Sequence, residues 1–271
     1  MRVVGYRLAI ALTLALLPPL LSACPPSPDT PHGGNPGRMS DAQYDMARDL
    51  WLRQGKTREA LGHALKAVDL NDDNSDAEHL VALIYLDFCE KSPDDCRLAD
   101  AEKYTRMALD ARPDFREAKN TLGVILIHEK RYDDAIKVLK PLTADILYAT
   151  PENAWGNLGW AYLEKGELNK AIDALQRSVA AQPVFCVGNY RLGRAFEQKK
   201  QLQSALEAYT NALETDSLAC KKLQVAFAGK GRVELVLGQA DKARADLDQC
   251  VKLDEATHAG KECSSMLEKL K

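Results

Sequence analysis

The sequence predicts an all-α protein, a solenoid of about six helix-turn-helix repeats closed by a capping helix at the C-terminus. The main observation is an alanine that recurs among large apolar residues at intervals of 41, 34, 36, 34 and 38 residues. A glycine stands upstream of four of these alanines, and small residues of this kind let paired helices cross closely. The recurring alanines are Ala60, Ala101, Ala135, Ala171, Ala205 and Ala243, and the glycines are Gly123, Gly159, Gly193 and Gly231.

Residues 1–23 have the features of a secretory signal peptide. Arg2 and Arg7 give a positive start, and residues 8–21 are predominantly apolar with an interruption by two adjacent prolines. The unbroken apolar run is shorter than the ~20 residues that a membrane-spanning helix needs. The leader therefore predicts export rather than a transmembrane anchor.

The leader ends in the sequence LSAC, at residues 21–24, which resembles a bacterial lipobox. The resemblance implies that the Cys24 thiol takes a diacylglyceryl group, that cleavage precedes Cys24, and that its new amine is acylated. Each buried methylene contributes ~0.8 kcal/mol, so three acyl chains would make the attachment nearly permanent. Pro25 stands where an Asp would resemble an inner-membrane retention signal, which favours the outer membrane. An ordinary signal peptide with an incidental cysteine remains the alternative.

After Cys24, residues 25–40 predict a flexible tether, because they are rich in Pro and Gly and show no apolar periodicity. Loss of Arg2 and Arg7 with the signal peptide would leave 34 basic against 39 acidic side chains, a net charge of −5. No basic block or stripe is present, which argues against binding to nucleic acid.

Residues 41–271 predict the repeat domain, with six units over about 41–254. The clearest unit is WGNLGWAYLEKGELNKAIDALQRSVAAQP, at residues 155–183. It resembles the tetratricopeptide repeat, which implies a right-handed superhelix of paired helices. The first unit is weaker, as terminal repeats usually are, and a helix over 256–270 would cover the last exposed face. The residues that carry the resemblance are Trp155, Leu158, Gly159, Tyr162, Ala171 and Pro183.

Six cysteines follow Cys24, an even number in a chain predicted to be exported, which favours disulfides. Fifteen pairings are possible, and the repeat frame favours pairing each cysteine with its neighbour in sequence. Zinc binding is disfavoured because no C-x₂-C pair is present, and a free buried Cys250 remains an alternative. The favoured pairs are Cys89 with Cys96, Cys186 with Cys220, and Cys250 with Cys263.

No catalytic motif is present: the sequence lacks G-x-S-x-G, H-E-x-x-H, a P-loop and G-x-G-x-x-G. The five histidines are dispersed, and acidic pairs such as Asp72 and Asp73 suit helix starts and solvated turns. We expect a protein that is not an enzyme and that uses no cofactor, metal or small-molecule substrate.

The tetratricopeptide resemblance implies that the first helix of each repeat lines a groove for a segment of a partner protein. Trp160 is the best single candidate for contact, and packing of about half of the set between repeats is the alternative. A carboxylate clamp of the kind that binds chaperone tails is rejected, since only two of its five positions match. The five positions are occupied by Asn120, Val124, Asn157, Val187 and Arg191. The predicted groove residues are Asn120, Val124, Ile127, His128, Trp160, Leu163, Tyr190, Arg194, Glu197, Val225 and Arg232.

Together, the lipobox, the tether and six repeats resemble the pilotin group of type IV pilus biogenesis lipoproteins, which includes PilF, PilW and Tgl. The resemblance implies an outer-membrane lipoprotein, facing the periplasm, that helps the pilus secretin insert and assemble without any covalent step. Two alternatives stay open. One is an adaptor for peptidoglycan hydrolases, as in lipoproteins resembling NlpI, and the other is an accessory subunit of a β-barrel insertion machine.

Overall fold

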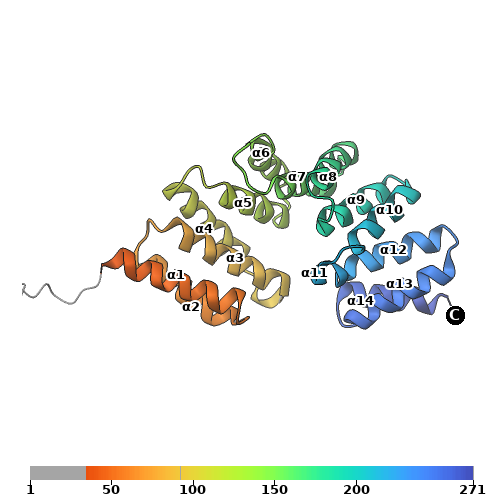
Figure 1. Cartoon of the computed structure of the whole chain (residues 1–271), viewed down its shortest axis with the longest axis horizontal. Coiled ribbons are helices and arrows are strands. Elements are labelled where there is room, and N and C mark those ends of the chain that lie inside the picture. Colours follow the sequence, from red (N-terminus) through yellow and green to blue (C-terminus); the bar gives the residue numbers. More distant parts are fainter. Residues whose placement is uncertain (1–34, 92, 271) are drawn as a thin grey trace, which may run out of the picture. The chain divides into compact units, whose positions relative to one another are not determined.

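A computed structural model describes residues 35–91 and 93–270, and these residues form α-helices, one short 3₁₀ helix and no strand (Figure 1). Six helix pairs follow one another along the chain. The pairs are α1 (Pro36–Leu52) with α2 (Thr57–Leu70), α3 (Ser75–Lys91) with α4 (Leu98–Ala111), α5 (Arg116–His128) with α6 (Tyr132–Leu142), α7 (Pro151–Lys165) with α8 (Leu168–Ala181), α9 (Cys186–Gln198) with α10 (Leu202–Leu213), and α12 (Gln224–Val236) with α13 (Ala240–Leu253). The remaining elements are η1 (Pro93–Asp95), α11 (Leu218–Lys221) and the C-terminal α14 (His258–Glu268).

The helices pack only on near neighbours in the chain, within the part that the structure describes. Each first helix packs on its own second helix and also on the first helix of the next pair. The first helices α1, α3, α5, α7, α9 and α12 thus form one continuous row that ends at α14, which we call the first-helix row. Contact between adjacent repeats alone is the packing pattern of a solenoid, so the predicted all-α repeat architecture is confirmed.

The spacing of small residues explains why the helices of a pair approach so closely. All six recurring alanines are fully buried. The glycines face a large residue four positions after the alanine: a Cβ on Gly159 would lie 2.5 Å from Leu175 Cγ, and one on Gly231 2.7 Å from Leu247 Cγ. Such distances are too short for any side chain, so only glycine lets these large residues fill the core.

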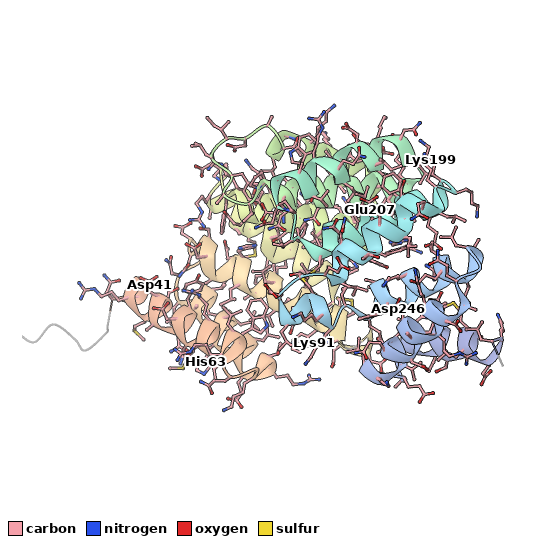
Figure 2. The ribbon with its side chains drawn as sticks, turned by 45° about the vertical axis from the view of Figure 1, so that its right-hand side comes forward. Asp41, His63, Lys91, Lys199, Glu207 and Asp246 are labelled. Carbon is pink, nitrogen blue, oxygen red and sulfur yellow. A yellow bond between two sulfur atoms is a disulfide. The ribbon has the colours of Figure 1, made fainter. Side chains whose placement is uncertain are left out.

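Charged side chains such as Asp41, Lys91 and Lys199 project from the helices into solvent (Figure 2). The apolar core is instead a series of clusters, each shared by consecutive helices. Leu139, for example, is fully buried in the cluster shared by α5, α6 and α7. Apolar burial is thus distributed along the chain rather than gathered in one centre.

The first helix begins earlier than expected. We predicted an unfolded tether up to residue 40, but α1 starts at Pro36, and its Ser40 is fully buried and donates a hydrogen bond to the Ala67 carbonyl at 2.7 Å. The tether prediction is therefore wrong for residues 36–40. Asn35 caps the helix by accepting a hydrogen bond from the Gly37 amide at 2.9 Å, and proline is well tolerated at the first helical position. The signal peptide and Cys24 lie outside the described residues.

Three disulfides join neighbouring elements. The Cys89–Cys96 bridge lies across the enlarged connection between α3 and α4. The second bridge joins the start of α9 to α11, and the third joins α13 to α14. The second and third bridges are Cys186–Cys220 and Cys250–Cys263. All three pairs are those that the repeat frame favoured.

Candidate functional site

Three consecutive helices of the first-helix row are joined by one chain of side-chain hydrogen bonds. The Asn157 amide on α7 donates to Asn120 Oδ1 on α5 at 3.0 Å. Arg191 on α9 in turn donates to Asn157 Oδ1 at 2.8 Å and to the Gly156 carbonyl at 3.3 Å. Because these groups are partly buried, each bond is stronger than it would be in water. The chain of bonds fixes the spacing of the repeats at the centre of the row.

The indole of Trp160 lies beside this chain of bonds and is held on several sides. The Arg191 guanidinium lies 4.3 Å from the ring centroid, and the His128 ring meets the indole edge-on with centroids 5.2 Å apart. Its Nε1 donates to Glu164 Oε1 at 3.1 Å, and the same oxygen accepts from Arg194 at 2.8 Å. The indole is therefore a half-buried, oriented aromatic group, the kind of side chain that often anchors a bound segment.

Further along the row, Glu197 and Arg232 form a clasp between helices. Arg232 on α12 donates from Nε and Nη2 to the two carboxylate oxygens of Glu197 on α9, at 2.6 and 3.1 Å, and also donates to Glu262 on α14. The Tyr209 hydroxyl donates to Glu197 at 2.7 Å. Burial alone would raise the pKa of Glu197, but the hydrogen bonds from Arg232 and Tyr209 outweigh it and lower that pKa. These groups are engaged with one another, and they join the last repeats to the C-terminal helix.

The structure separates the predicted groove residues into three kinds. Ile127 and Leu163 are 3% and 2% exposed and belong to the core, so the prediction that they line an accessible groove is wrong. The reason is that each first helix packs on its own partner and on two further repeats, which leaves only a narrow stripe facing solvent. His128 and Val225 are exposed. The half-buried members are Asn120, Val124, Trp160, Tyr190, Arg194, Glu197 and Arg232.

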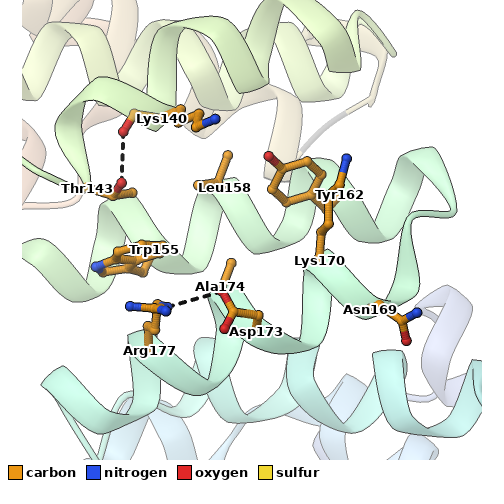
Figure 3. Close-up of a pocket in the computed structure, with 10 residues that line it drawn as sticks. All are labelled: Lys140, Thr143, Trp155, Leu158, Tyr162, Asn169, Lys170, Asp173, Ala174 and Arg177. Carbon is orange, nitrogen blue, oxygen red and sulfur yellow. Dashed lines mark hydrogen bonds and ion pairs between the residues drawn. The ribbon is translucent and has the colours of Figure 1, made fainter.

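A pocket that was not predicted from the sequence lies against α7 and is lined by none of the predicted groove residues (Figure 3). It is a pocket of about 490 Å³ between α6, α7 and α8, with Trp155 and Tyr162 in its wall. Both aromatic residues belong to the repeat pattern and were assigned to packing for that reason. The signal that could have found the pocket is the basic residues near them, Lys140, Lys170 and Arg177.

Over the residues that the structure describes, no group of three or more His, Cys, Asp or Glu side chains could hold a metal ion. No helix among them is both long and apolar enough to cross a membrane. What the described surface offers is a rigid row of helices with polar and aromatic groups, and this arrangement suits recognition of a protein segment.

Sequence comparison finds tetratricopeptide repeats in the central part of the chain. Tetratricopeptide-repeat family models match residues 97–146, 152–185 and 188–217. The chain is also 28% identical over 147 residues to the type IV pilus assembly protein PilF of Pseudomonas aeruginosa. That match covers 52% of this chain and 56% of the relative, so it spans about half of the relative's length.

Solved structures with the same fold include two from type IV pilus systems. PilW, described as a widely conserved type IV pilus biogenesis factor, gives a TM-score of 0.67 at 23% identity, over 82% of this chain and 96% of that one. Pseudomonas aeruginosa PilF gives a TM-score of 0.64 at 19% identity, over 85% and 99% of the two chains. At these identities the likeness shows a shared repeat fold, which extends over nearly the whole of both known structures.

Proposed function

Because this tetratricopeptide-repeat chain is homologous to PilF over half its length, we propose that it is a type IV pilus biogenesis lipoprotein. In this proposal Cys24 carries the lipid, and the repeats face the periplasm from the outer membrane. The repeats bind a segment of the pilus secretin and assist its assembly and insertion. The observation that carries the proposal is the 28% identity over 147 residues to a curated pilus assembly protein.

The proposed mechanism is stoichiometric and needs no covalent step. The hydrogen bonds from Asn120 to Arg191 hold the first-helix row in one shape, so a bound segment meets a surface that is already formed. Preformed surfaces lose less conformational entropy on binding. Trp160 and Tyr190 offer aromatic contacts on that surface, while the lipid carries the complex to the membrane. The three disulfides suit a chain that works in an oxidising compartment.

The experiment that tests the proposal is an immunoblot for heat- and detergent-resistant secretin multimers in cells that lack the gene. We expect the multimers to vanish while the secretin monomer remains, and the intact gene to restore them. Cys24→Ala should accumulate as protein, leave the membrane fraction and fail to restore the multimers. Normal multimers without the gene would overturn the proposal, and capture of peptidoglycan hydrolases by the anchored repeats would then favour the adaptor function.

Trp160 gives a sharper test of the binding surface. We expect Trp160→Ala to weaken capture of the secretin about tenfold or more, because oriented aromatic anchors commonly carry over 1 kcal/mol of binding free energy. Trp160→Phe is the matched control, since it keeps a smaller aromatic ring at this position and loses the hydrogen bond to Glu164. Pull-down of the secretin from detergent extracts measures the effect. Equal capture by Trp160→Ala and the parent would remove Trp160 from the binding surface.

A further inference from the structure

The pocket between α6, α7 and α8 has an apolar floor and aromatic walls (Figure 3). Leu158 and Ala174 are buried at its base. Trp155 and Tyr162 stand above them and are half-buried, so part of each ring remains open to solvent. Its volume of about 490 Å³ lies within the range of pockets that bind side chains or small ligands, roughly 300–1,000 Å³.

Positive charge surrounds these aromatic rings. The Arg177 guanidinium lies 5.0 Å from the centroid of the Trp155 ring, and Lys170 Nζ lies 5.5 Å from that of Tyr162. Lys140 adds a third cation from α6. Asp173 is the one carboxylate in the lining, and it accepts a hydrogen bond from Arg177 Nε at 3.1 Å. Lys170 Nζ also pairs at 2.6 Å with Glu167, which lies outside the lining, so a ligand carboxylate would share or replace that partner. The pocket is therefore net positive although the chain carries a formal net charge of −3.

The same kind of groove recurs one repeat later, between α8, α9 and α10, with a volume of about 470 Å³. Its lining is different. The equivalent positions lie one repeat, or 34 residues, further along the chain. There Trp155 is replaced by Asn189, Lys170 by Ser204 and Arg177 by Asn211. Glu207, which is labelled in Figure 2, is the only charged side chain that lines this second groove.

The difference between the two grooves shows which lining residues the repeat fold needs and which are available for binding. The repeat fold forms a groove at both places, and it does so without cations or tryptophan in the second. Phe196 takes the place of Tyr162 in the second groove, so only the tryptophan and the cations of the first groove are not needed to form such a groove. Charge complementarity instead indicates a negatively charged occupant, and the apolar floor indicates that the occupant also carries a large apolar side chain.

We propose that the α6–α7–α8 pocket is a docking site for an acidic peptide segment, separate from the first-helix row. One apolar side chain of the segment inserts between Trp155 and Tyr162. Neighbouring carboxylates pair with Lys140, Lys170 and Arg177, and Arg177 offers the two-pronged geometry that suits a carboxylate. The site does not depend on the proposed pilus function, because it is defined by chemistry that any partner segment could supply.

The test uses the purified full chain and a fluorescein-labelled dodecapeptide of Asp, Glu, Gly and Ser with a single central Leu. Two comparison peptides replace either the Leu by Ser or every acidic residue by Lys. We expect fluorescence anisotropy to show saturable binding of the acidic Leu peptide, at least tenfold tighter than either comparison. Raising NaCl from 50 to 300 mM should weaken binding several-fold, because salt screens partly exposed charges.

Matched variants locate the binding. Lys170→Ser with Arg177→Asn installs the residues of the next repeat and lowers the net charge by two, and we expect it to weaken binding at least tenfold. Ser204→Asp with Asn211→Asp lowers the net charge by the same amount in the second groove and should leave the affinity within twofold. Circular dichroism melting checks that both variants fold.

Two results would overturn the docking site. One is the absence of saturable binding up to about 1 mM peptide, the weak end of specific recognition. The other is an equal loss of affinity in both double variants, which would assign the binding to the charge of the whole surface. Neither result bears on secretin assembly in cells, so this proposal and the proposed pilus function can fail independently.

Discussion

Glu78 is a buried carboxyl group without enough hydrogen-bond partners. It is 1% exposed on α3, and its Oε2 has no partner. Burial, followed by the nearby charges of Asp72, Asp73 and Asp110, raises the pKa of Glu78 to about 7. The buried Glu234 on α12 is a second case, in which burial and then Asp246 raise the pKa to about 7. Both groups favour their neutral form inside the folded chain.

Glu78 and Glu234 should therefore each lower the stability of the protein as the pH rises from about 5 to 7.5, while His79, whose pKa burial lowers to about 4, contributes in the opposite direction up to about pH 6.5. In that window the folded chain keeps protons on Glu78 and Glu234 that the unfolded chain has released, so the free energy of unfolding falls with pH. Glu78→Gln keeps the shape and removes the charge, and we expect it to raise the free energy of unfolding at pH 7.5 by about 1–2 kcal/mol, with little change at pH 5. Urea denaturation at the two pH values measures this. The exposed Glu117→Gln is the control, and an equal gain there would refute the role of burial.

Single residues also show which features of the site could be predicted from the sequence and which could not. Trp160 could be placed on the first-helix row because its position within the repeat fixes the helix face that it occupies. Leu163 occupies a similar face, yet it is buried, because the packing of the next repeat covers that part of the helix. The bonds from Asn120 through Asn157 to Arg191 depend on how adjacent repeats stack, which the periodicity of one helix does not specify.

Five of the described turns between the two helices of a pair contain one residue with a left-handed backbone, and this residue is either glycine or lysine. After α1, α7 and α12 the left-handed position is glycine, as at Gly166 with a φ of 84°. After α5 and α9 the same position is Lys130 or Lys200, with φ of 61° and 63°. A left-handed conformation costs a residue with a Cβ roughly 1–2 kcal/mol, so these two turns carry a small local strain.

Replacing Lys200 by Gly should relieve that strain. We expect Lys200→Gly to raise the free energy of unfolding by about 0.5 kcal/mol, since relief of the left-handed backbone exceeds the extra entropy of glycine in the unfolded chain. Gly166→Ala is the reciprocal change, and it should destabilise by a similar amount, because its Cβ meets no atom within 4 Å and only the backbone is affected. Chemical denaturation measures both. The opposite sign in either variant would contradict this account of the turns.

Element boundaries were predicted well where the pattern is strong and poorly at the first helix. The capping helix was expected over 256–270 and is found as α14 (His258–Glu268). The start of α1 differs from the prediction because the prolines and glycines of residues 25–40 predict a tether. Asn35 followed by Pro36 is a helix-start signal, but the apolar contacts that confirm a helix begin only later in the sequence.

Over the whole molecule, the disulfides constrain segments of different length. Cys186 and Cys220 are 34 residues apart, whereas Cys89 and Cys96 are seven apart. In the loop-entropy account the longer closure stabilises by about 3–4 kcal/mol and the shorter by about 2 kcal/mol. The long bridge ties α9 of the fifth repeat to α11, which lies in the connection that leads to the sixth repeat.

We therefore expect the double variant Cys186→Ser with Cys220→Ser to lose about 1 kcal/mol or more beyond the loss in Cys89→Ser with Cys96→Ser. Guanidinium denaturation of each variant, with fluorescence and circular dichroism as probes, measures the difference. A larger loss in the variant without the short bridge would show that the enlarged α3–α4 connection limits stability instead.

The order of the cysteines has a consequence for how the chain matures. Each of the six cysteines after Cys24 forms a disulfide with its immediate neighbour in the sequence. No bridge therefore encloses or crosses another. If Cys24 carries the proposed lipid and forms no disulfide, the second cysteine of each pair meets its native partner as the first free cysteine on the N-terminal side. Repeats that contact only their neighbours can fold one after another as the chain emerges. Oxidation can thus follow synthesis in strict order, with no wrongly joined intermediate that an isomerase must first undo.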